Sequence, residues 1–474
     1  MTTIDARDQP PAENAASAGW ALAGLSLSVL LSSLGTSIAN VGLPALGQAF
    51  AASFQQIQWV VIAYLLATTA LIVSIGRIGD IVGHRRLLLA GIVLFTAASI
   101  VCALAPALWL LIAARAAQGA GAAVMMALAM ALVGGMVSKE RTGRAMGLLG
   151  TMSAIGTALG PSLGGFLIAG GGWPAIFLVN IPFGVLAWVL VWRALPPDRG
   201  ATPDRAGFDY AGTLLLTITL AVYALALTTG RGNFGPLNAA LLLAAVVGMS
   251  FFVLAETRVE RPLVRLTMFR NPLLSASLAT SLLVSAVMMA TLVVGPFYLA
   301  GALGLDAARV GLVAAAGPVV TALTGVPAGR IADRVGAYPT SVIGLALIAA
   351  GSFILSQLPA SFGIAGYVAP IMIATSGYAL FQTANNTAVM TGIARDERGR
   401  MSGLLNLSRN LGLITGASVM GAVFALAAGG DVTTAQPDAV ARGMRITFAV
   451  AGVLMVLALA IAVGSRALAA RRRG

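Results

Sequence analysis

The chain has 474 residues, of which 58% are hydrophobic and only 9% charged, and its formal net charge is +13. Its mean hydropathy is +0.93. A soluble domain carries about 25% charged residues, so this composition excludes a soluble protein and indicates one that crosses a membrane many times. With one cysteine, Cys102, and one histidine, His84, the chain has no internal disulfide or cysteine metal cluster, and we expect no cofactor or metal.

Fourteen apolar stretches separated by charged or Pro/Gly-containing breaks are candidates for membrane spans. A helix needs about 20 residues to cross a bilayer, and backbone polar groups must be satisfied inside lipid, so we predict an all-α polytopic membrane protein. In chain order the predicted spans are 20–44, 56–76, 87–106, 108–136, 142–170, 175–193, 208–229, 237–254, 273–300, 307–329, 339–358, 363–391, 401–428 and 443–464.

The basic residues alternate between the loops that these spans create. With the N-terminus placed in the cytoplasm, 23 of the 29 Lys and Arg residues fall in cytoplasmic segments, four fall on the opposite side, and Arg115 and Arg409 fall inside spans. Positive loops stay on the cytoplasmic side, so this bias predicts a multi-pass protein of the plasma (inner) membrane with both termini in the cytoplasm. The charge surplus then faces anionic lipid headgroups, and no nucleic-acid partner is expected.

The chain contains an internal repeat. The stretch GRIGDIVGHRR at 76–86 returns as GRIADRVGA at 329–337, and KERTGRAMGLL, ending at Leu149, returns at nearly the same offset as DERGRMSGLL, ending at Leu405. Parallel repeats of this kind build transporters whose substrate site lies between two halves. The predicted organisation is a tail (1–19), a six-helix half (20–193), an inserted two-helix linker (194–272), a second six-helix half (273–464) and a basic tail (465–474).

Three further motifs lie within the predicted spans. Span four carries RAAQGAGAA from Arg115, span five carries GTALGPSLGG from Gly156, and the first span ends with LGTSIANVGLP at Pro44. With the repeated loop, these motifs resemble the major facilitator superfamily and, more narrowly, its fourteen-span drug:proton antiporters of the QacA/EmrB type. The resemblance covers nearly the whole chain after residue 20. It implies a monomeric secondary transporter that moves small molecules through the lipid bilayer in exchange for protons.

The loop after span two matches the signature loop of the superfamily at five positions, Gly76, Asp80, Gly83, Arg85 and Arg86. In the family the aspartate belongs to a charge relay that stabilises the outward-open arrangement. By position, Arg144 before span five and Arg409 in span thirteen are the candidate partners. The alternative is a loop whose charges only fix the orientation of the chain in the membrane and take no part in gating.

The family associates the span-four arginine, here Arg115, with proton transfer. An arginine within a span usually faces a polar interior, but one near the end of a span can instead extend to the interface. The span-five glycines and proline match the antiporter motif, which the family has in exporters, and the alternative is a generic close-packed helix. The motif residues are Gly156, Gly160, Pro161, Gly164 and Gly165.

The sequence departs from the family at Gly35, where these exporters usually have an aspartate. None of the 16 acidic residues falls in the middle of a predicted span. Exporters of cations normally use an embedded carboxylate, whose pKa is raised by desolvation so that it can hold either a proton or the drug. Without it, neutral or weakly anionic substrates are favoured, and Arg115 and Arg409 would favour anions. Coupling could run through Asp80 and its arginines or through protons carried by the substrate.

Polar groups of spans one, four, twelve and thirteen, with two aromatic side chains as apolar walls, are the candidate lining of the substrate pocket. Asparagine and glutamine also join helices by hydrogen bonds, so each has a purely structural alternative, which is stronger for Asn406 near the cytoplasmic end of its span. The candidates are Asn40, Gln118, Gln382, Asn385, Asn386 and Asn406, with Tyr64 and Phe381 as the walls.

The sequence therefore predicts an exporter of small organic compounds, of the drug or multidrug efflux type, that works by proton antiport and alternating access. The alternative within the same class is an exporter of one specific anionic or neutral metabolite, such as a siderophore, rather than a multidrug pump. A membrane enzyme would need a catalytic constellation that the chain lacks, and a channel or receptor would not need two repeated halves. No GxxxxGK[ST] phosphate loop is present, which argues against a nucleotide-driven pump.

Overall fold

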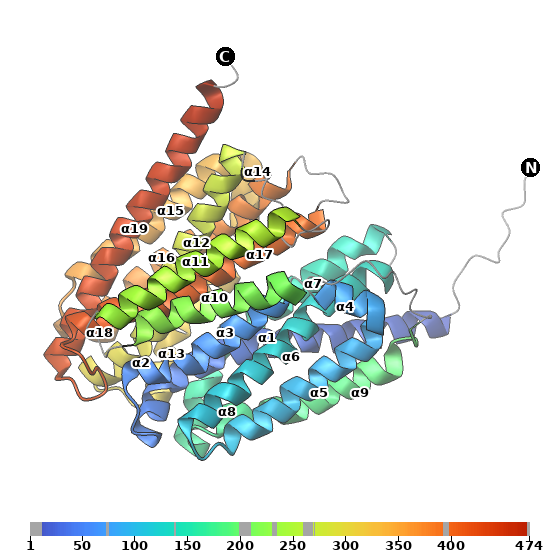
Figure 1. Cartoon of the computed structure of the whole chain (residues 1–474), viewed down its shortest axis with the longest axis horizontal. Helices are drawn as coiled ribbons and strands as arrows, with labels where there is room; N and C mark the ends of the chain where they lie inside the picture. The colour runs from blue at the N-terminus through green and yellow to red at the C-terminus, as the bar shows by residue number, and fades with distance from the viewer. Residues whose placement is uncertain are drawn as a thin grey trace, which may run out of the picture.

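The computed structural model is helical throughout the part of the chain that it describes (Figure 1). A few side chains within helices, among them those of Asp80 and Arg144, are outside the described set. The described residues are 12–72, 75–136, 139–198, 210–229, 235–258, 269, 271–391 and 398–471.

The first half of the molecule is built from nine helical segments that form six long hydrophobic rods. The segments are α1 (Ala12–Ala49), α2 (Phe54–Ile57), α3 (Trp59–Ile72), α4 (Ile75–Val82), α5 (His84–Ala103), α6 (Leu108–Met136), α7 (Lys139–Gly171), α8 (Ala175–Leu178) and α9 (Asn180–Ala194). Two inserted helices follow, α10 (Tyr210–Thr228) and α11 (Pro236–Arg258).

The second half repeats this plan, with two short π-helical turns inserted. Its segments are α12 (Pro272–Phe297), η2 (Tyr298–Ala302), α13 (Ala307–Ala314), α14 (Ala316–Val335), α15 (Ala337–Gln357), η3 (Ala360–Phe362), α16 (Gly363–Met390), α17 (Arg398–Thr415), η4 (Gly416–Met420), α18 (Gly421–Ala427) and α19 (Pro437–Arg471).

Every predicted span coincides with one of these rods. Among the described residues, thirteen helical stretches are long and apolar enough to cross a membrane, and the apolar stretch Gly212–Thr228 of α10 is shorter. The all-α membrane fold is therefore confirmed, whereas the count of fourteen spans and the domain boundaries stay predictions.

Side-chain caps define several helix starts in the loops. Ser53 accepts a hydrogen bond from the backbone N–H of Gln56, whose side chain accepts one from Ser53 in return. Asn271 and Asp306 cap α12 and α13 without the reciprocal bond: their side chains accept hydrogen bonds from the backbone N–H groups of Leu273 and Arg309, respectively. These caps satisfy N–H groups that the first helical turn leaves free, so these polar residues fix where α2, α12 and α13 begin.

Equivalent glycines give the two halves the same internal packing. Gly121 of α6 lies against the backbone of α5, where a Cβ would be 2.7 Å from the amide nitrogen of Phe95. Gly377 of α16 lies against α15 in the same manner, with a hypothetical Cβ 2.9 Å from the amide nitrogen of Ile348. The repeat found in the sequence therefore corresponds to a repeat of helix–helix contacts.

The two halves meet at the end of the molecule where α2, α8 and α18 lie, away from both termini (Figure 1). The ring of Phe54 packs edge-on against Phe297 at 4.8 Å and Phe424 at 5.4 Å between centroids. Gln58 donates from Nε2 to the carbonyl of Ala417 at 2.9 Å. We call this region the closed end.

The backbones of α7 and α13 are also in direct contact between the halves. A Cβ on Gly311 of α13 would overlap the carbonyl oxygen of Pro161, and one on Gly165 of α7 would overlap that of Ala307. Glycine at both positions therefore allows an approach that any other residue would prevent.

The inserted helix α10 touches both halves. Trp59 of α3 donates from its indole nitrogen to the Thr228 hydroxyl at 2.9 Å, and the Tyr223 hydroxyl lies 3.3 Å from that of Thr415 in α17. In Figure 1, α10 runs between the two halves beside α3, and α11 lies next to it. The insertion thus lies along the seam between the halves.

Gly311→Val tests whether the α7–α13 contact keeps the closed end closed. Overpacking such a contact costs about 1–3 kcal/mol, so the ratio of closed to open molecules should fall roughly ten- to hundredfold. Spin labels on Ala51→Cys and Thr434→Cys, in a Cys102→Ala background, should move apart. Gly325→Ala is the matched control because a Cβ there would meet no atom within 4 Å; unchanged distances in Gly311→Val would refute the assignment.

Candidate functional site

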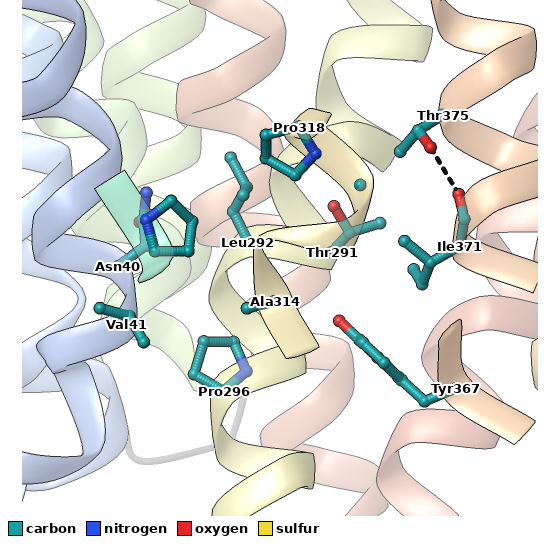
Figure 2. A pocket seen from close by; sticks show the side chains of 12 residues that line it. Asn40, Val41, Thr291, Leu292, Pro296, Ala314, Pro318, Tyr367, Ile371 and Thr375 are labelled. Atoms are coloured by element: carbon teal, nitrogen blue, oxygen red, sulfur yellow. Dashed lines mark hydrogen bonds between the residues drawn. The ribbon is translucent and has the colours of Figure 1, made fainter. Parts of the chain in front are cut away.

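A small cavity of about 30 Å³ lies between the two halves (Figure 2). Residues of α1 and α7 form one wall, and residues of α12, α13, α14 and α16 form the others. The lining residues are Asn40, Val41, Pro161, Thr291, Leu292, Pro296, Ala314, Gly317, Pro318, Tyr367, Ile371 and Thr375. Transporters with parallel repeats bind their substrate at this kind of interface.

Asn40 contributes a free acceptor to this cavity. Its side chain is 1% exposed, and its Nδ2 donates to the carbonyl of Thr36 at 3.0 Å. Its Oδ1 is buried and has no hydrogen-bond partner. Because the Thr36 carbonyl can only accept, the amide nitrogen must face it, and the oxygen is the atom that stays unpaired.

Prolines leave further acceptors on the lining. Proline has no N–H, so the carbonyl four residues before it in a helix loses its donor. Pro296 follows Leu292 by four residues, as Pro44 follows Asn40, and both helices continue through their proline. Pro318 follows Ala314 by the same interval across the junction of α13 and α14.

The lining hydroxyl groups differ in whether they can donate a hydrogen bond to a solute. Thr291 donates its proton to the Met288 carbonyl at 2.6 Å, and Thr375 donates to the Ile371 carbonyl at 2.8 Å, so both present only acceptor lone pairs. Tyr367 makes no hydrogen bond to any described residue, and Figure 2 shows its hydroxyl directed toward Thr291. The cavity is thus uncharged and richer in acceptors than in donors.

A second polar cluster is centred on Arg115, which is 0% exposed. Its Nε donates to the Val60 carbonyl at 2.9 Å and its Nη1 to Gln118 Oε1. Gln118 in turn donates to the Ser99 hydroxyl at 2.7 Å. The guanidinium carbon lies 4.3 Å from the centre of the Tyr64 ring, a cation–π geometry.

These bonds hold the Arg115 guanidinium away from the cavity. Tyr64 is fixed as well, because its hydroxyl donates to the Ser32 carbonyl at 2.7 Å. A Cβ on Gly35 would be 3.2 Å from that hydroxyl and from the Phe95 ring. Tyr64 and Phe95 therefore occupy the space around the position where the family usually has an aspartate.

The other predicted pocket residues on α16 do not line this cavity. Phe381 is buried between α16 and α15, and Asn386 is exposed. Gln382 and Asn385 each keep one buried polar atom without a partner, Oε1 and Nδ2 respectively. Asn40 is the one predicted pocket residue that the cavity includes.

The lining residues that the sequence did not single out come mostly from the second half. Thr291, Pro296, Tyr367 and Thr375 carry no motif of their own. The signal that would have found two of them is the repeat, since Leu292 and Pro296 occupy in α12 the relative positions of Asn40 and Pro44 in α1.

The glycines of the predicted antiporter motif lie where α7 crosses α1. Cβ atoms on Gly156, Gly160 and Gly164 would overlap or crowd Leu30, Ser37 and Ile38 of α1. Pro161 of the same motif reaches the cavity. The motif therefore connects the packing of the first half to the cavity wall.

Part of the predicted charge relay lies outside the described residues, namely the side chains of Asp80 and Arg144. Gly76 lies on α4, and Arg409 is half-buried on α17. Arg85 donates from Nη2 to the Trp192 carbonyl at 2.6 Å, and Arg86 is exposed. The relay itself stays a prediction.

An aspartate that the sequence analysis did not select completes this loop. The Asp198 carboxylate, after α9, accepts the backbone N–H of Arg85 at 3.0 Å and that of Arg86 at 3.1 Å. Gly83 precedes them with φ +102°, and a Cβ there would overlap that carboxylate. Because Gly83 supplies no capping side chain, α5 receives its N-terminal cap from a distant segment.

Arg115→Lys should destabilise the protein although it keeps the charge. A lysine cannot bond both Val60 and Gln118 in fixed directions or stack on Tyr64, so about 1–3 kcal/mol of unfolding free energy should be lost. Thermal unfolding in detergent measures the change. Arg309→Lys, at an exposed ion pair with Asp306, is the control and should change little. Equal midpoints for the two variants would contradict the network.

Asp198→Ala should loosen the start of α5. Loss of such a cap costs about 0.5–2 kcal/mol, and the amides of Arg85 and Arg86 should exchange hydrogen faster. Hydrogen-exchange mass spectrometry of this segment reads the effect directly. Asp333→Ala, at the exposed end of α14, is the matched control, and unchanged protection in Asp198→Ala would rule out the cap.

Comparison with known proteins agrees with this architecture. The family model of the Major Facilitator Superfamily matches residues 25–417 and 276–470. The uncharacterized transporter YebQ of Escherichia coli is 33% identical, with 84% of this chain and 86% of YebQ covered. The multidrug resistance protein Stp of Mycobacterium tuberculosis is 32% identical (82% and 72% covered), and the riboflavin transporter RibZ of Clostridioides difficile is 29% identical (84% and 86%).

Among solved structures, a bacterial homolog of the human lysosomal transporter Spinster, in an inward-facing and occupied conformation, superposes with a TM-score of 0.69. It is 16% identical, and the match covers 94% of this chain and 96% of that one, so the likeness concerns the fold. Fold and family together indicate a membrane transporter rather than an enzyme. The chain belongs to the major facilitator superfamily.

Proposed function

We propose that this transporter is a secondary active exporter of small organic compounds that works by alternating access and proton antiport. The observation that carries the proposal is the cavity lined by both halves beneath the closed end. Rocking of one half against the other would expose such a cavity to each side in turn.

The proposed orientation places both termini in the cytoplasm of a cell whose plasma (inner) membrane holds the protein. It rests on the distribution of the 29 basic residues, 23 of which lie in segments on the side of the termini. In this orientation the closed end faces outward, so the cavity of this conformation would load from the cytoplasm. We propose that the transporter acts as a monomer.

The proposed direction of transport is supported by the antiporter motif in α7 and by relatives. The glycines of the motif pack against α1, and Gly165 and Pro161 reach the second half. The name of the relative Stp attributes multidrug resistance to that protein. Export is therefore the direction that we assign to this chain.

The proposed proton route differs from that of exporters that use a carboxylate embedded in the membrane. No acidic residue lies mid-span in the sequence, and an arginine such as Arg115 stays protonated in proteins. We assign coupling to the signature loop, with Asp80 as the proton-linked group and Arg85, Arg86, Arg144 and Arg409 as its neighbours. Protons carried by the substrate itself are the alternative.

A second candidate function is the export of one anionic or neutral metabolite. The uncharged cavity favours it, since a pump for lipophilic cations would benefit from a carboxylate there. The relative RibZ, named a riboflavin transporter, is consistent with a narrow substrate range in this part of the family.

Transport into everted vesicles that contain the full chain tests the proposal. Cationic, neutral and anionic compounds are offered with and without an imposed pH gradient, acidic inside. We expect gradient-dependent accumulation of neutral or anionic compounds, abolished by a protonophore. Asp80→Asn should lose about a hundredfold or more of the transport rate, the usual scale for a positioned proton-transfer group.

The control for this experiment is Asp333→Asn in the second copy of the loop, which should transport normally. Accumulation that ignores the pH gradient would refute proton antiport. Accumulation of cations alone would refute the assigned substrate charge, and full activity of Asp80→Asn would remove the signature loop from the coupling route.

A further inference from the structure

We infer that the cavity between the halves selects uncharged solutes that donate hydrogen bonds, through hydroxyl, amine or amide N–H groups, and that Asn40 Oδ1 is the specificity-determining acceptor. The inference rests on the proposed function, because it names the substrate class of the same cavity. Of the cationic, anionic and neutral substrates considered for this cavity, it selects the neutral ones.

The first step is charge. None of the twelve lining side chains ionises at neutral pH. The nearest candidate for a fixed charge in the sequence, Arg115, is bound to Val60, Gln118 and the face of Tyr64 and does not line the cavity. An ion that enters a neutral, low-dielectric cavity loses its hydration without gaining a counter-charge, so both cations and anions are disfavoured.

The second step is the polarity of the lining. The hydroxyls of Thr291 and Thr375 donate their protons to carbonyls of their own helices, and the amide oxygen of Asn40 is unpaired. The carbonyls of Leu292 and Ala314 have lost their helical donors to proline. Tyr367 supplies the one free hydroxyl donor among the lining side chains. An acceptor-rich wall is satisfied by a solute that brings donors of its own.

The third step is the free-energy cost of leaving the Asn40 acceptor without a hydrogen bond when no solute is bound. Asn40 lines the cavity and is more than nine-tenths buried, and its Oδ1 is unpaired. A buried acceptor without a partner is unfavourable, so a solute that donates to it gains affinity over an analogue that cannot. Val41, Ile371 and the three prolines supply apolar surface for the remainder of the solute.

The cavity is small in this closed conformation. It has about 30 Å³, room for roughly two water molecules, whereas pockets that hold small organic ligands span roughly 300–1,000 Å³. Binding of a solute therefore requires the two halves to move apart at this lining.

A matched set of fluorescent probes tests the inference on the purified full chain in nanodiscs. Aminomethylcoumarin is uncharged and donates two hydrogen bonds, whereas its N,N-dimethyl analogue has the same ring and no donor. The acetic acid derivative adds a negative charge and the trimethylammonium analogue a positive one. We expect aminomethylcoumarin to bind about tenfold more tightly than each of the other three in calorimetric titrations.

Asn40→Leu keeps the side-chain size and removes the acceptor, so it should abolish the preference for the amino over the dimethylamino probe. Asn40→Asp places a carboxylate in the same position and should instead raise affinity for the trimethylammonium probe about tenfold or more. Ser376→Ala, at a serine of α16 that donates to the Met372 carbonyl outside the cavity, should keep the wild-type order. Asn40→Asp keeps the test decisive if Asn40→Leu fails to fold.

Two results would overturn the inference: equal affinity for the four probes, including no binding of any, or a donor preference that survives in Asn40→Leu. Its failure is distinct from that of the proposed function. Gradient-driven accumulation of anions in everted vesicles, with no donor preference in nanodiscs, would refute only the inference. Donor-selective binding without export would refute only the proposed function.

Discussion

Direct contact between helix backbones, made where glycine omits the side chain, is the constraint on which the rest of this structure depends. In a bilayer the lipid tails are as apolar as the helices, so close packing and hydrogen bonds must supply the association. A Cβ on Gly119 would overlap the carbonyl of Tyr64, and one on Gly412 would overlap that of Leu282. Such contacts hold each half rigid, and the Gly165–Gly311 contact then joins the halves at one end.

Rigid halves explain why polar groups can be left unsatisfied at the cavity. Freed backbone carbonyls are costly in lipid and are tolerated only where protein or a cavity surrounds them. Leu292 and Ala314, each four residues before a proline, both lie on the cavity wall. In the same structure Arg115 is held by hydrogen bonds from Nε and Nη1 and by the face of Tyr64, while its Nη2 is buried without a partner, and its side chain does not line the cavity.

The apolar runs and the repeated loop were sufficient to predict the rods, their order and the two-half plan, because length and hydropathy decide what crosses a bilayer. These patterns could not predict which face of each helix lines the cavity. The motif identified Asn40 correctly as a lining residue, whereas the predicted pocket residues Gln118 and Tyr64 instead contact Arg115. Asp198 was missed because its partner amides at the start of α5 lie far away in the sequence.

The π-helical turn η4 corresponds by packing to the proline of α7. Gly156 and Gly412 lie against equivalent carbonyls, Leu30 and Leu282, so Pro161 in the first half matches Ala417 in the second. The regular hydrogen-bond ladder is interrupted at both places, once by a missing donor and once by a widened turn. One helix of each half therefore lacks part of its regular backbone hydrogen bonding at equivalent positions, by a proline in α7 and by a π-turn in the second half.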